Sequence, residues 1–309
     1  MPLKVSIVGV APAHRAPNPA ESLVLRALEL VSGSRVELVG TREADLVLLY
    51  PYRFPFGSGA AGALLESAVR RLRFPAKDRR ADVVLRKAFG LASHTNLIAI
   101  SHENLDRRPW QALGNFIVQT DIPRLTSWPT EVDPRGFRLP YWWNYVDWPE
   151  IPRTSNSFST RVGPYYDLSS LLTNQLFNDD HSRRKNRAVW ITNHLDFPRK
   201  EILQRMQKHF RVDVVNNVPW GKKLELLQQY KYCVTSENSP GYGYESEKVP
   251  EARIAGCIPI GYIANPFSDF NVQAYFFDPP VGEIEILPPL LHERPQISGL
   301  LDYLAKVID

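Results

Sequence analysis

Hydrophobic positions in the first half of the chain alternate between short continuous runs and stretches with helical spacing. Strand-length runs cover residues 5–10, 35–39, 45–50 and 96–101, and a helical pattern covers residues 21–31. The run at 45–50 is continuous, as is typical of a strand buried on both faces of a parallel sheet. Strands alternating with helices in this way predict a doubly wound parallel sheet.

The second half of the chain restarts the same alternation. Strands are expected at 187–192, 212–215 and 232–235, and helices at 199–210 and 222–230. A chain of 309 residues is also longer than one ordinary hydrophobic core supports. We therefore expect two α/β domains, one formed by residues 1–155 and the other by residues 156–309.

A segment rich in proline and tryptophan, residues 128–152, separates the two halves. Its composition predicts an irregular path that is packed by its aromatic side chains. Trp142 and Trp143 lie in this segment, and flat aromatic surfaces suit sugar rings. They are therefore candidates for an acceptor-facing wall, although packing in a core between the domains is the interpretation that the composition favours.

The overall composition is that of a water-soluble globular protein, with 44% hydrophobic and 23% charged residues. The net charge of +4 gives no reason to propose nucleic-acid binding, but it is compatible with an anionic small ligand in a local positive site. Cys233 and Cys257 lie in apolar runs, which predicts buried free thiols and a reducing compartment. The first residues are typical of a strand and not of a signal peptide, and no apolar run has the length of a membrane span.

The most chemically dense part of the chain is the segment 237–248. It contains three glutamates, one asparagine, two tyrosines and one lysine, interrupted by two glycines and one proline. Glycine and proline exclude a regular helix or strand there, and an apolar run precedes the segment. Polar loops between a strand and a helix are where α/β proteins bind nucleotides and phosphates.

Pro250 indicates where the next helix begins, because proline is tolerated in the first helical turn. The helix is expected to start near Glu247 or Lys248 and to end near Ala255, with Gly256 as its terminator. Lys248 and the helix N-terminus would then favour a pyrophosphate. For Glu247 two roles stay open: an acceptor of hydrogen bonds from ribose or sugar hydroxyls, or a carboxylate that interacts with the helix dipole.

Other side chains could complete a phosphate and nucleotide site. Arg199, at the start of a predicted helix, is a second candidate phosphate ligand because guanidinium matches phosphate in a bidentate manner. Further candidates on the nucleotide side are Asn193, Asn216, Asn238 and Tyr244. The chain contains no glycine-rich dinucleotide fingerprint after its first strand and no P-loop, which argues against a dehydrogenase and a P-loop enzyme.

Residues 230–277 resemble the α-1,3/1,4-fucosyltransferase family, and its bacterial members most closely. The residues that carry the resemblance are Glu237-Asn238-Ser239, Tyr244-Glu245-Ser246-Glu247-Lys248, Ala255-Gly256-Cys257-Ile258-Pro259-Ile260-Gly261 and Ser268-Asp269-Phe270-Asn271. Weaker likeness extends upstream to Trp190-Ile191-Thr192-Asn193, which precedes Arg199. It also includes residues 98–104, which look like the strand that ends at the family's catalytic glutamate.

This resemblance implies a GT-B fold, in which two Rossmann-like doubly wound domains face each other across a cleft. The C-terminal domain would bind GDP-fucose and the N-terminal domain would bind the acceptor. Glu103 would remove the proton from the acceptor hydroxyl in a single inverting displacement, with His102 as a competing base on the acceptor side. The implied acceptor is a lactosamine- or lactose-type glycan that receives L-fucose at O3 of GlcNAc or Glc.

The resemblance further implies a bacterial cytoplasmic enzyme of glycan biosynthesis, with peripheral association at the inner face of the membrane as an option. No visible motif requires a metal, although Mn²⁺ or Mg²⁺ could stimulate the reaction. Two alternatives stay open: a GT-B enzyme with another nucleotide sugar, and a catalytically silent protein that binds nucleotide sugars or glycans. The presence of Glu103, Glu247 and Lys248 argues against the silent protein.

Overall fold

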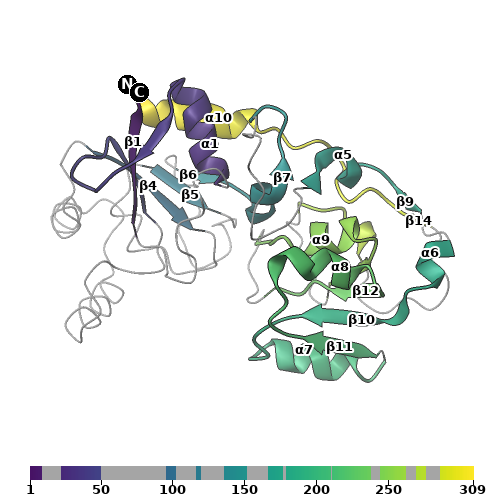
Figure 1. Ribbon diagram of the computed structural model, residues 1–309. Coiled ribbons are helices and arrows are strands. Elements are labelled where there is room, and N and C mark those ends of the chain that lie inside the picture. The colour runs from purple at the N-terminus through teal and green to yellow at the C-terminus, as the bar shows by residue number, and fades with distance from the viewer. Residues whose placement is uncertain are drawn as a thin grey trace, which may run out of the picture. The chain divides into compact units, whose positions relative to one another are not determined.

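The computed structural model describes residues 1–8, 22–49, 95–101, 116–119, 136–151, 166–176, 179–209, 211–237, 244–261, 269–275 and 286–309. The chain forms two compact units. Unit 1 consists of Met1–Leu139, Glu150–Ser155 and Ile297–Asp309, and unit 2 consists of Pro140–Pro149 and Asn156–Gln296. Each unit is built on its own parallel sheet (Figure 1).

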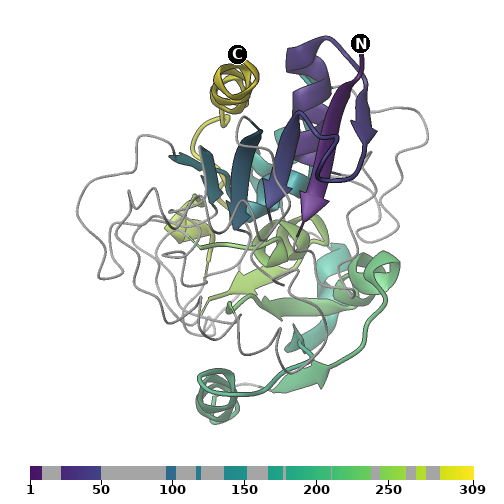
Figure 2. The ribbon, with the colours of Figure 1, turned by 90° about the vertical axis from the view of Figure 1, so that its left-hand side faces the viewer.

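Unit 1 contains a six-stranded sheet in the order β2-β1-β3-β4-β5-β6 (Figure 2). Its strands are β1 (Leu3–Val8), β2 (Val36–Leu38), β3 (Leu46–Leu49), β4 (Asn96–Ser101), β5 (Phe116–Gln119) and β6 (Gly136–Arg138). Every neighbouring pair in this sheet is parallel. The doubly wound parallel sheet predicted for the first half of the chain is therefore confirmed.

Two helices, α1 (Leu23–Ser32) and α10 (Ser298–Ile308), pack against each other in unit 1. The Ser22 hydroxyl caps the start of α1 by accepting a hydrogen bond from a backbone N–H of its first turn, and Gly33 ends the helix with a left-handed φ of 60°. Helix α10 contacts the sheet at two strands. The Asn96 side chain donates to the Val307 carbonyl at 2.8 Å, and the rings of Phe137 and Tyr303 lie 5.3 Å apart.

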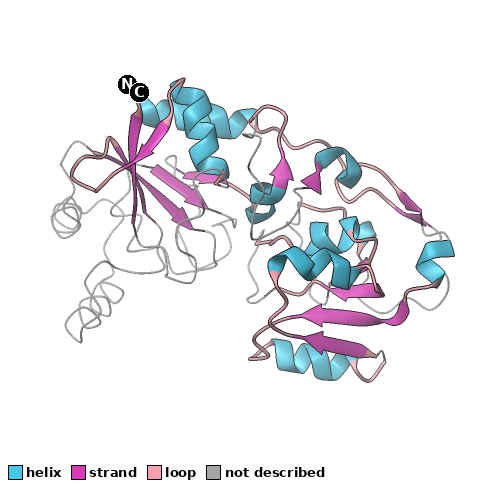
Figure 3. Ribbon diagram, in the orientation of Figure 1, coloured by secondary structure: helices cyan, strands magenta, loops and turns pink. Residues whose placement is uncertain are grey.

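Unit 2 contains a four-stranded sheet in the order β11-β10-β12-β13 (Figure 3). Its strands are β10 (Lys185–Ile191), β11 (Val212–Val215), β12 (Tyr230–Val234) and β13 (Ile258–Ile260). All three pairs are parallel. The α/β pattern expected for the second half of the chain is thus present as well.

Alternate side chains of these strands enter two different cores, one on each face of the sheet. Ala188 and Trp190 of β10 pack in a cluster with residues of α7 (Arg199–Met206). Val189, between them, packs with residues of α8 (Lys223–Leu227) and α9 (Lys248–Ile254). Successive side chains of a strand point to opposite faces of the sheet. A strand that is apolar at every position therefore needs a helix on each face, which produces the doubly wound arrangement.

The remaining elements are short. They are η3 (Tyr141–Tyr145), β7 (Val146–Asp147), β8 (Tyr166–Asp167), α5 (Leu168–Leu171), β9 (Gln175–Leu176), α6 (Asp179–Ser182), η4 (Trp220–Lys222), η5 (Val272–Ala274) and β14 (Ile286–Leu287). None of the helices described above combines the length and the apolar composition that crossing a lipid bilayer requires. Cys233 and Cys257 are free thiols buried in unit 2.

Two predicted helices extend further toward the C-terminus than the helices in the structure. The helix expected at 222–230 ends at Leu227, and Tyr230 instead begins β12, where it pairs with Lys185 of β10. The Tyr230 side chain is buried in the sheet core, so tertiary packing outweighs the helical spacing. The helix expected at 199–210 likewise ends at Met206.

Helix α9 starts and ends as its sequence predicts. It begins at Lys248, and Gly256 follows its last turn with a φ of 75°, which strongly favours glycine. The guanidinium of Arg184 lies against this glycine and donates to the Ala255 carbonyl at 2.8 Å. A Cβ atom at position 256 would lie 2.6 Å from Nη2 of Arg184.

The substitution Gly256→Ala should therefore destabilise the protein more than Gly33→Ala does. Both glycines have a positive φ, but a Cβ at position 33 would meet nothing within 4 Å, whereas one at 256 would displace Arg184. The strain alone costs about 1 kcal/mol, and the displaced guanidinium adds to this. Urea unfolding of the two variants measures the difference. Equal losses would show that the contact with Arg184 contributes nothing.

Candidate functional site

The carboxyl ends of β10 and β12 form the switch point of the unit 2 sheet. The chain that leaves β10 continues through α7 on one face, and the chain that leaves β12 continues through α9 on the other. Because these connections diverge, the edge between them is where an open α/β sheet binds its ligand. Polar residues follow both strands here, at 192–194 and at 235–237.

Arg199, the first residue of α7, is held beside the end of β10. Its Nη1 donates to the hydroxyl of Thr192 at 2.6 Å and to the carbonyl of His194 at 3.2 Å. The side chain is buried, which lowers the pKa of Arg199, whereas the nearby Glu237 and Tyr244 favour its charged form. The structure therefore places a preorganised guanidinium at the switch point, where the sequence predicts a phosphate ligand.

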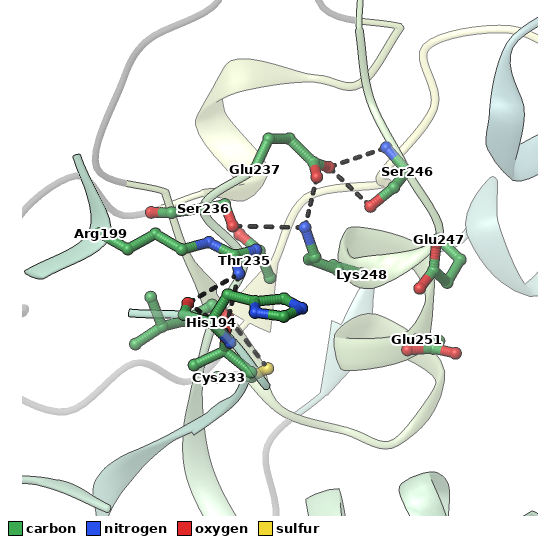
Figure 4. A network of polar contacts seen from close by, with 12 residues as sticks. His194, Arg199, Cys233, Thr235, Ser236, Glu237, Ser246, Glu247, Lys248 and Glu251 are labelled. Carbon is green, nitrogen blue, oxygen red and sulfur yellow. Dashed lines mark hydrogen bonds and ion pairs between the residues drawn. The ribbon is translucent and has the colours of Figure 1, made fainter. Parts of the chain in front are cut away.

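Lys248, the first residue of α9, approaches from the other strand. Its Nζ donates to the carboxylate of Glu237 and to the carbonyl of Ser236 at 3.4 Å (Figure 4). The other carboxylate oxygen of Glu237 accepts from the backbone N–H and the hydroxyl of Ser246, at 2.8 and 2.7 Å. Glu237 thus joins the residues on either side of the segment 238–243.

Asn193 links two neighbouring strand ends of the same edge. Its side-chain oxygen accepts from the backbone N–H of Asn217 at 2.7 Å, and Asn217 has a left-handed φ of 52°. Asn216 precedes it and is exposed at the end of β11. Tyr244 is buried, and its hydroxyl lies near enough to Arg199 to favour the charged form of the guanidinium. These three predicted residues therefore lie at or near the carboxyl edge.

Glu247 lies apart from Lys248 although the two residues are adjacent in sequence. Figure 4 shows Glu247 and Glu251 on one side of α9 and Lys248 on the other. The Nζ of Lys223, from α8, lies 3.3 Å from the Glu247 carboxylate and 3.2 Å from that of Glu251. This buried ion pair is a structural contact that neither of the two roles left open by the sequence includes.

The charge of this buried cluster is set by its neighbours. Burial works to raise the pKa of Glu247, but the ammonium groups of Lys223 and Lys248 outweigh it, so that the pKa is lowered. Burial raises the pKa of Glu251 to about 7, against the opposing effect of Lys223 and with a further contribution from Glu247. The buried side chain of Tyr166 is a further neighbour of Glu251: burial and the charge of Glu251 both raise the pKa of the Tyr166 hydroxyl.

The two tryptophans proposed as an acceptor-facing wall are buried. Trp142 is 1% exposed and donates from its indole nitrogen to Asp269 at 3.1 Å, and its ring centroid lies 5.3 Å from that of Phe270. Trp143 is 8% exposed and packs on Trp148 at 4.9 Å. A packing role therefore explains both side chains as they stand in this structure.

Three of the predicted site residues, His102, Glu103 and Asn238, lie outside the described residues. Conversely, the sequence reasoning assigns no role to Glu237, although its carboxylate connects Lys248 with Ser246. A carboxylate in the polar segment that follows a buried strand, eleven residues before a lysine that starts a helix, is the signal that could have identified it. Among the described residues, no three His, Cys, Asp or Glu side chains are grouped so that they could hold a metal ion.

The substitution Glu251→Gln should change how stability depends on pH. With a folded pKa of about 7 against an ordinary value of 4.5, Glu251 holds a proton that the unfolded chain has released. The free energy of unfolding of the wild type therefore falls as the pH rises from 4.5 to about 7. Glu247 has a lowered pKa, so it changes the stability only at pH values below this range.

The unfolding free energy of the Glu251→Gln variant should consequently gain on that of wild type between about pH 5 and about pH 7. Urea unfolding at several pH values measures this. Glu225→Gln, at an exposed ion pair with Lys222, is the control and should leave the slope unchanged. Parallel pH profiles for wild type and Glu251→Gln would contradict the assignment.

Comparison with known proteins finds solved structures of similar fold. Neither protein-family models nor curated proteins give a match. A crystal structure of an α1,3-fucosyltransferase with GDP-fucose matches with a TM-score of 0.50 and 16% identity, over 99% of this chain and 78% of that one. A structure of an α1,3-fucosyltransferase with GDP matches with a TM-score of 0.51 and 17% identity over the same shares.

At this level of identity the likeness is one of fold. The architecture that the sequence predicts, an α/β protein with two Rossmann-like sheets, is confirmed, and so is the resemblance to fucosyltransferases as far as the fold expresses it. The chain therefore has the GT-B fold of glycosyltransferases.

Proposed function

We propose that this protein is an inverting glycosyltransferase that moves L-fucose from GDP-fucose to a hydroxyl group of a glycan. The observation that carries the proposal is the placement of Arg199 and Lys248 at one switch point, on the two connections that diverge there. Structures with this fold include α1,3-fucosyltransferases with GDP-fucose and with GDP. The motifs of residues 230–277 narrow the donor from any nucleotide sugar to GDP-fucose.

The chemistry of the proposed reaction explains why cations are needed at this edge. Negative charge develops on the GDP leaving group as the bond to the fucose C1 breaks, and a fixed cation stabilises that charge more than it stabilises the bound donor. Arg199 is fixed by hydrogen bonds to Thr192 and His194 of its own chain. The conformational entropy of its side chain is therefore lost when the protein folds and not when the reaction takes place.

The remaining donor contacts are assigned to residues near the same edge. Tyr244 and Asn238 would bond a phosphate oxygen, the base or the ribose, and Asn193 and Asn216 are further candidates. The Glu247 carboxylate is 8% exposed and pairs with Lys223 through one oxygen, which leaves it less free than Lys248 to meet a ribose or sugar hydroxyl. We therefore place Glu247 second to Lys248 in the donor site.

Residues 1–155 would supply the acceptor side and the base. Glu103 removes the proton of the acceptor hydroxyl, with His102 beside it, and the hydroxyl oxygen attacks C1 as GDP departs. The transition state has oxocarbenium character, as in glycoside hydrolysis. The acceptor is a lactosamine- or lactose-type glycan fucosylated at O3, and the setting is glycan biosynthesis in a bacterial cytoplasm.

Donor choice is tested by titration calorimetry with GDP and UDP, followed by GDP-fucose and GDP-mannose. GDP should bind and UDP should not. Lys248→Met should weaken GDP binding by about tenfold or more, since a hydrogen bond to a charged group is lost. Lys222→Met, at an exposed lysine of the same unit, is the matched control and should bind GDP as wild type does. Preference for UDP would replace the donor assignment with another nucleotide sugar.

The catalytic assignment is tested by Glu103→Ala. Transfer of labelled fucose to a glycan array should be abolished, because the group assigned to accept the hydroxyl proton is removed, while the calorimetric affinity for GDP persists. Substantial turnover by Glu103→Ala would contradict the assignment of the base. A wild-type protein that binds GDP but transfers nothing to any acceptor would support the silent binding protein instead.

A further inference from the structure

The carboxylate of Glu237 is engaged on both of its oxygens. One oxygen accepts two hydrogen bonds from Ser246, from its backbone N–H at 2.8 Å and from its hydroxyl at 2.7 Å. The other oxygen forms an ion pair with Nζ of Lys248. The side chains of Glu237 and Lys248 are 15% and 18% exposed, so solvent screens the pair only in part.

These contacts differ in what they fix. A carboxylate bonded to a backbone N–H cannot rotate without losing that bond, so Ser246 determines where the second oxygen of Glu237 lies. That oxygen in turn determines where the ammonium of Lys248 lies. A lysine has a flexible four-carbon stem, and without a fixed partner its ammonium samples many positions. The position of Lys248 therefore depends on Glu237.

We propose that Glu237 is a positioning residue for anion binding: it holds the Lys248 ammonium at the carboxyl edge of the unit 2 sheet, ready for the pyrophosphate of the donor. This inference rests on the proposed function for the identity of the donor. The positioning itself requires only an anionic ligand with pyrophosphate chemistry.

A carboxylate beside an anion site also repels the ligand, and the two effects have opposite signs. The repulsion is small here because the charge of Glu237 is neutralised locally by Lys248 itself and by the two donors of Ser246. Without the carboxylate of Glu237, Lys248 keeps the longer contact with the carbonyl of Ser236, at 3.4 Å, which carries no charge and holds the ammonium less firmly. Removing the charge of Glu237 should therefore weaken anion binding.

The substitution Glu237→Gln separates the two contacts. The carbonyl oxygen of glutamine can still accept both hydrogen bonds from Ser246, but its amide cannot pair with an ammonium. The binding of GDP and of inorganic pyrophosphate is then measured by calorimetry in four proteins: wild type, Glu237→Gln, Lys248→Met and the double variant. Glu225→Gln, at the exposed pair with Lys222, is the matched control for the loss of one carboxylate.

Glu237→Gln should weaken the binding of both ligands by about tenfold, as expected for a lost charge-assisted contact. In the Lys248→Met background the same change should have an effect within about twofold, because a residue that acts through Lys248 has nothing left to position. Unchanged or tighter binding by Glu237→Gln would overturn the proposal. An equal loss in both backgrounds would overturn it too, because Glu237 would then act independently of Lys248.

The two ligands distinguish this inference from the proposed function. If wild type binds pyrophosphate but not GDP, the assignment of GDP-fucose as donor is rejected. The role of Glu237 is then tested by comparing pyrophosphate binding among the same four proteins. Binding of neither ligand by wild type would reject both proposals. If Glu237→Gln fails to fold, Ser246→Ala serves in its place, since it removes one bond that orients Glu237 and leaves every charge. Its effect should be smaller, about twofold to threefold, and should also vanish with Lys248→Met.

Discussion

The parallel pairing of β10 with β12 is the constraint on which the rest of unit 2 depends. Because both strands run in the same direction, their carboxyl ends share one edge, and because α7 and α9 cover opposite faces, the connections part there. An antiparallel pair would have put one of the two polar loops at the far end of the sheet. The topology of the sheet thus places Arg199 and Lys248 at the same edge, independently of the chemistry of their side chains.

The two residues at the start of helix α9 make different contacts. Lys248 lies on the side that faces Glu237, and Glu247 lies on the side that pairs with Lys223 of α8. Glu245, just before them, accepts a hydrogen bond from the backbone N–H of Asp269 at 2.8 Å. The charge-rich segment is therefore only in part a binding surface. Its three glutamates bind neighbouring parts of the chain and so hold the start of α9, and with it Lys248, in a defined position.

The sequence predicts features whose causes are local. The strands of both sheets follow from apolar runs, and the limits of α9 follow from Pro250 and Gly256. It does not predict features that depend on distant partners. The ion pair of Glu247 with Lys223 joins two helices, and the role of Glu237 depends on its contacts with Ser246 and Lys248. Likewise, Tyr230 has helical spacing, yet pairing with β10 makes it the start of a strand.

The return of the last residues to unit 1 has a consequence for biosynthesis. Helix α10 buries Leu300, Leu304 and Val307 within a unit whose other parts precede residue 156. During translation, nearly all of unit 2 leaves the ribosome before this helix does, so unit 2 can complete its core while unit 1 still lacks one of its layers. The amino-terminal unit then matures after unit 2, with the apolar surface that α10 will cover exposed to chaperones until this helix has been synthesised.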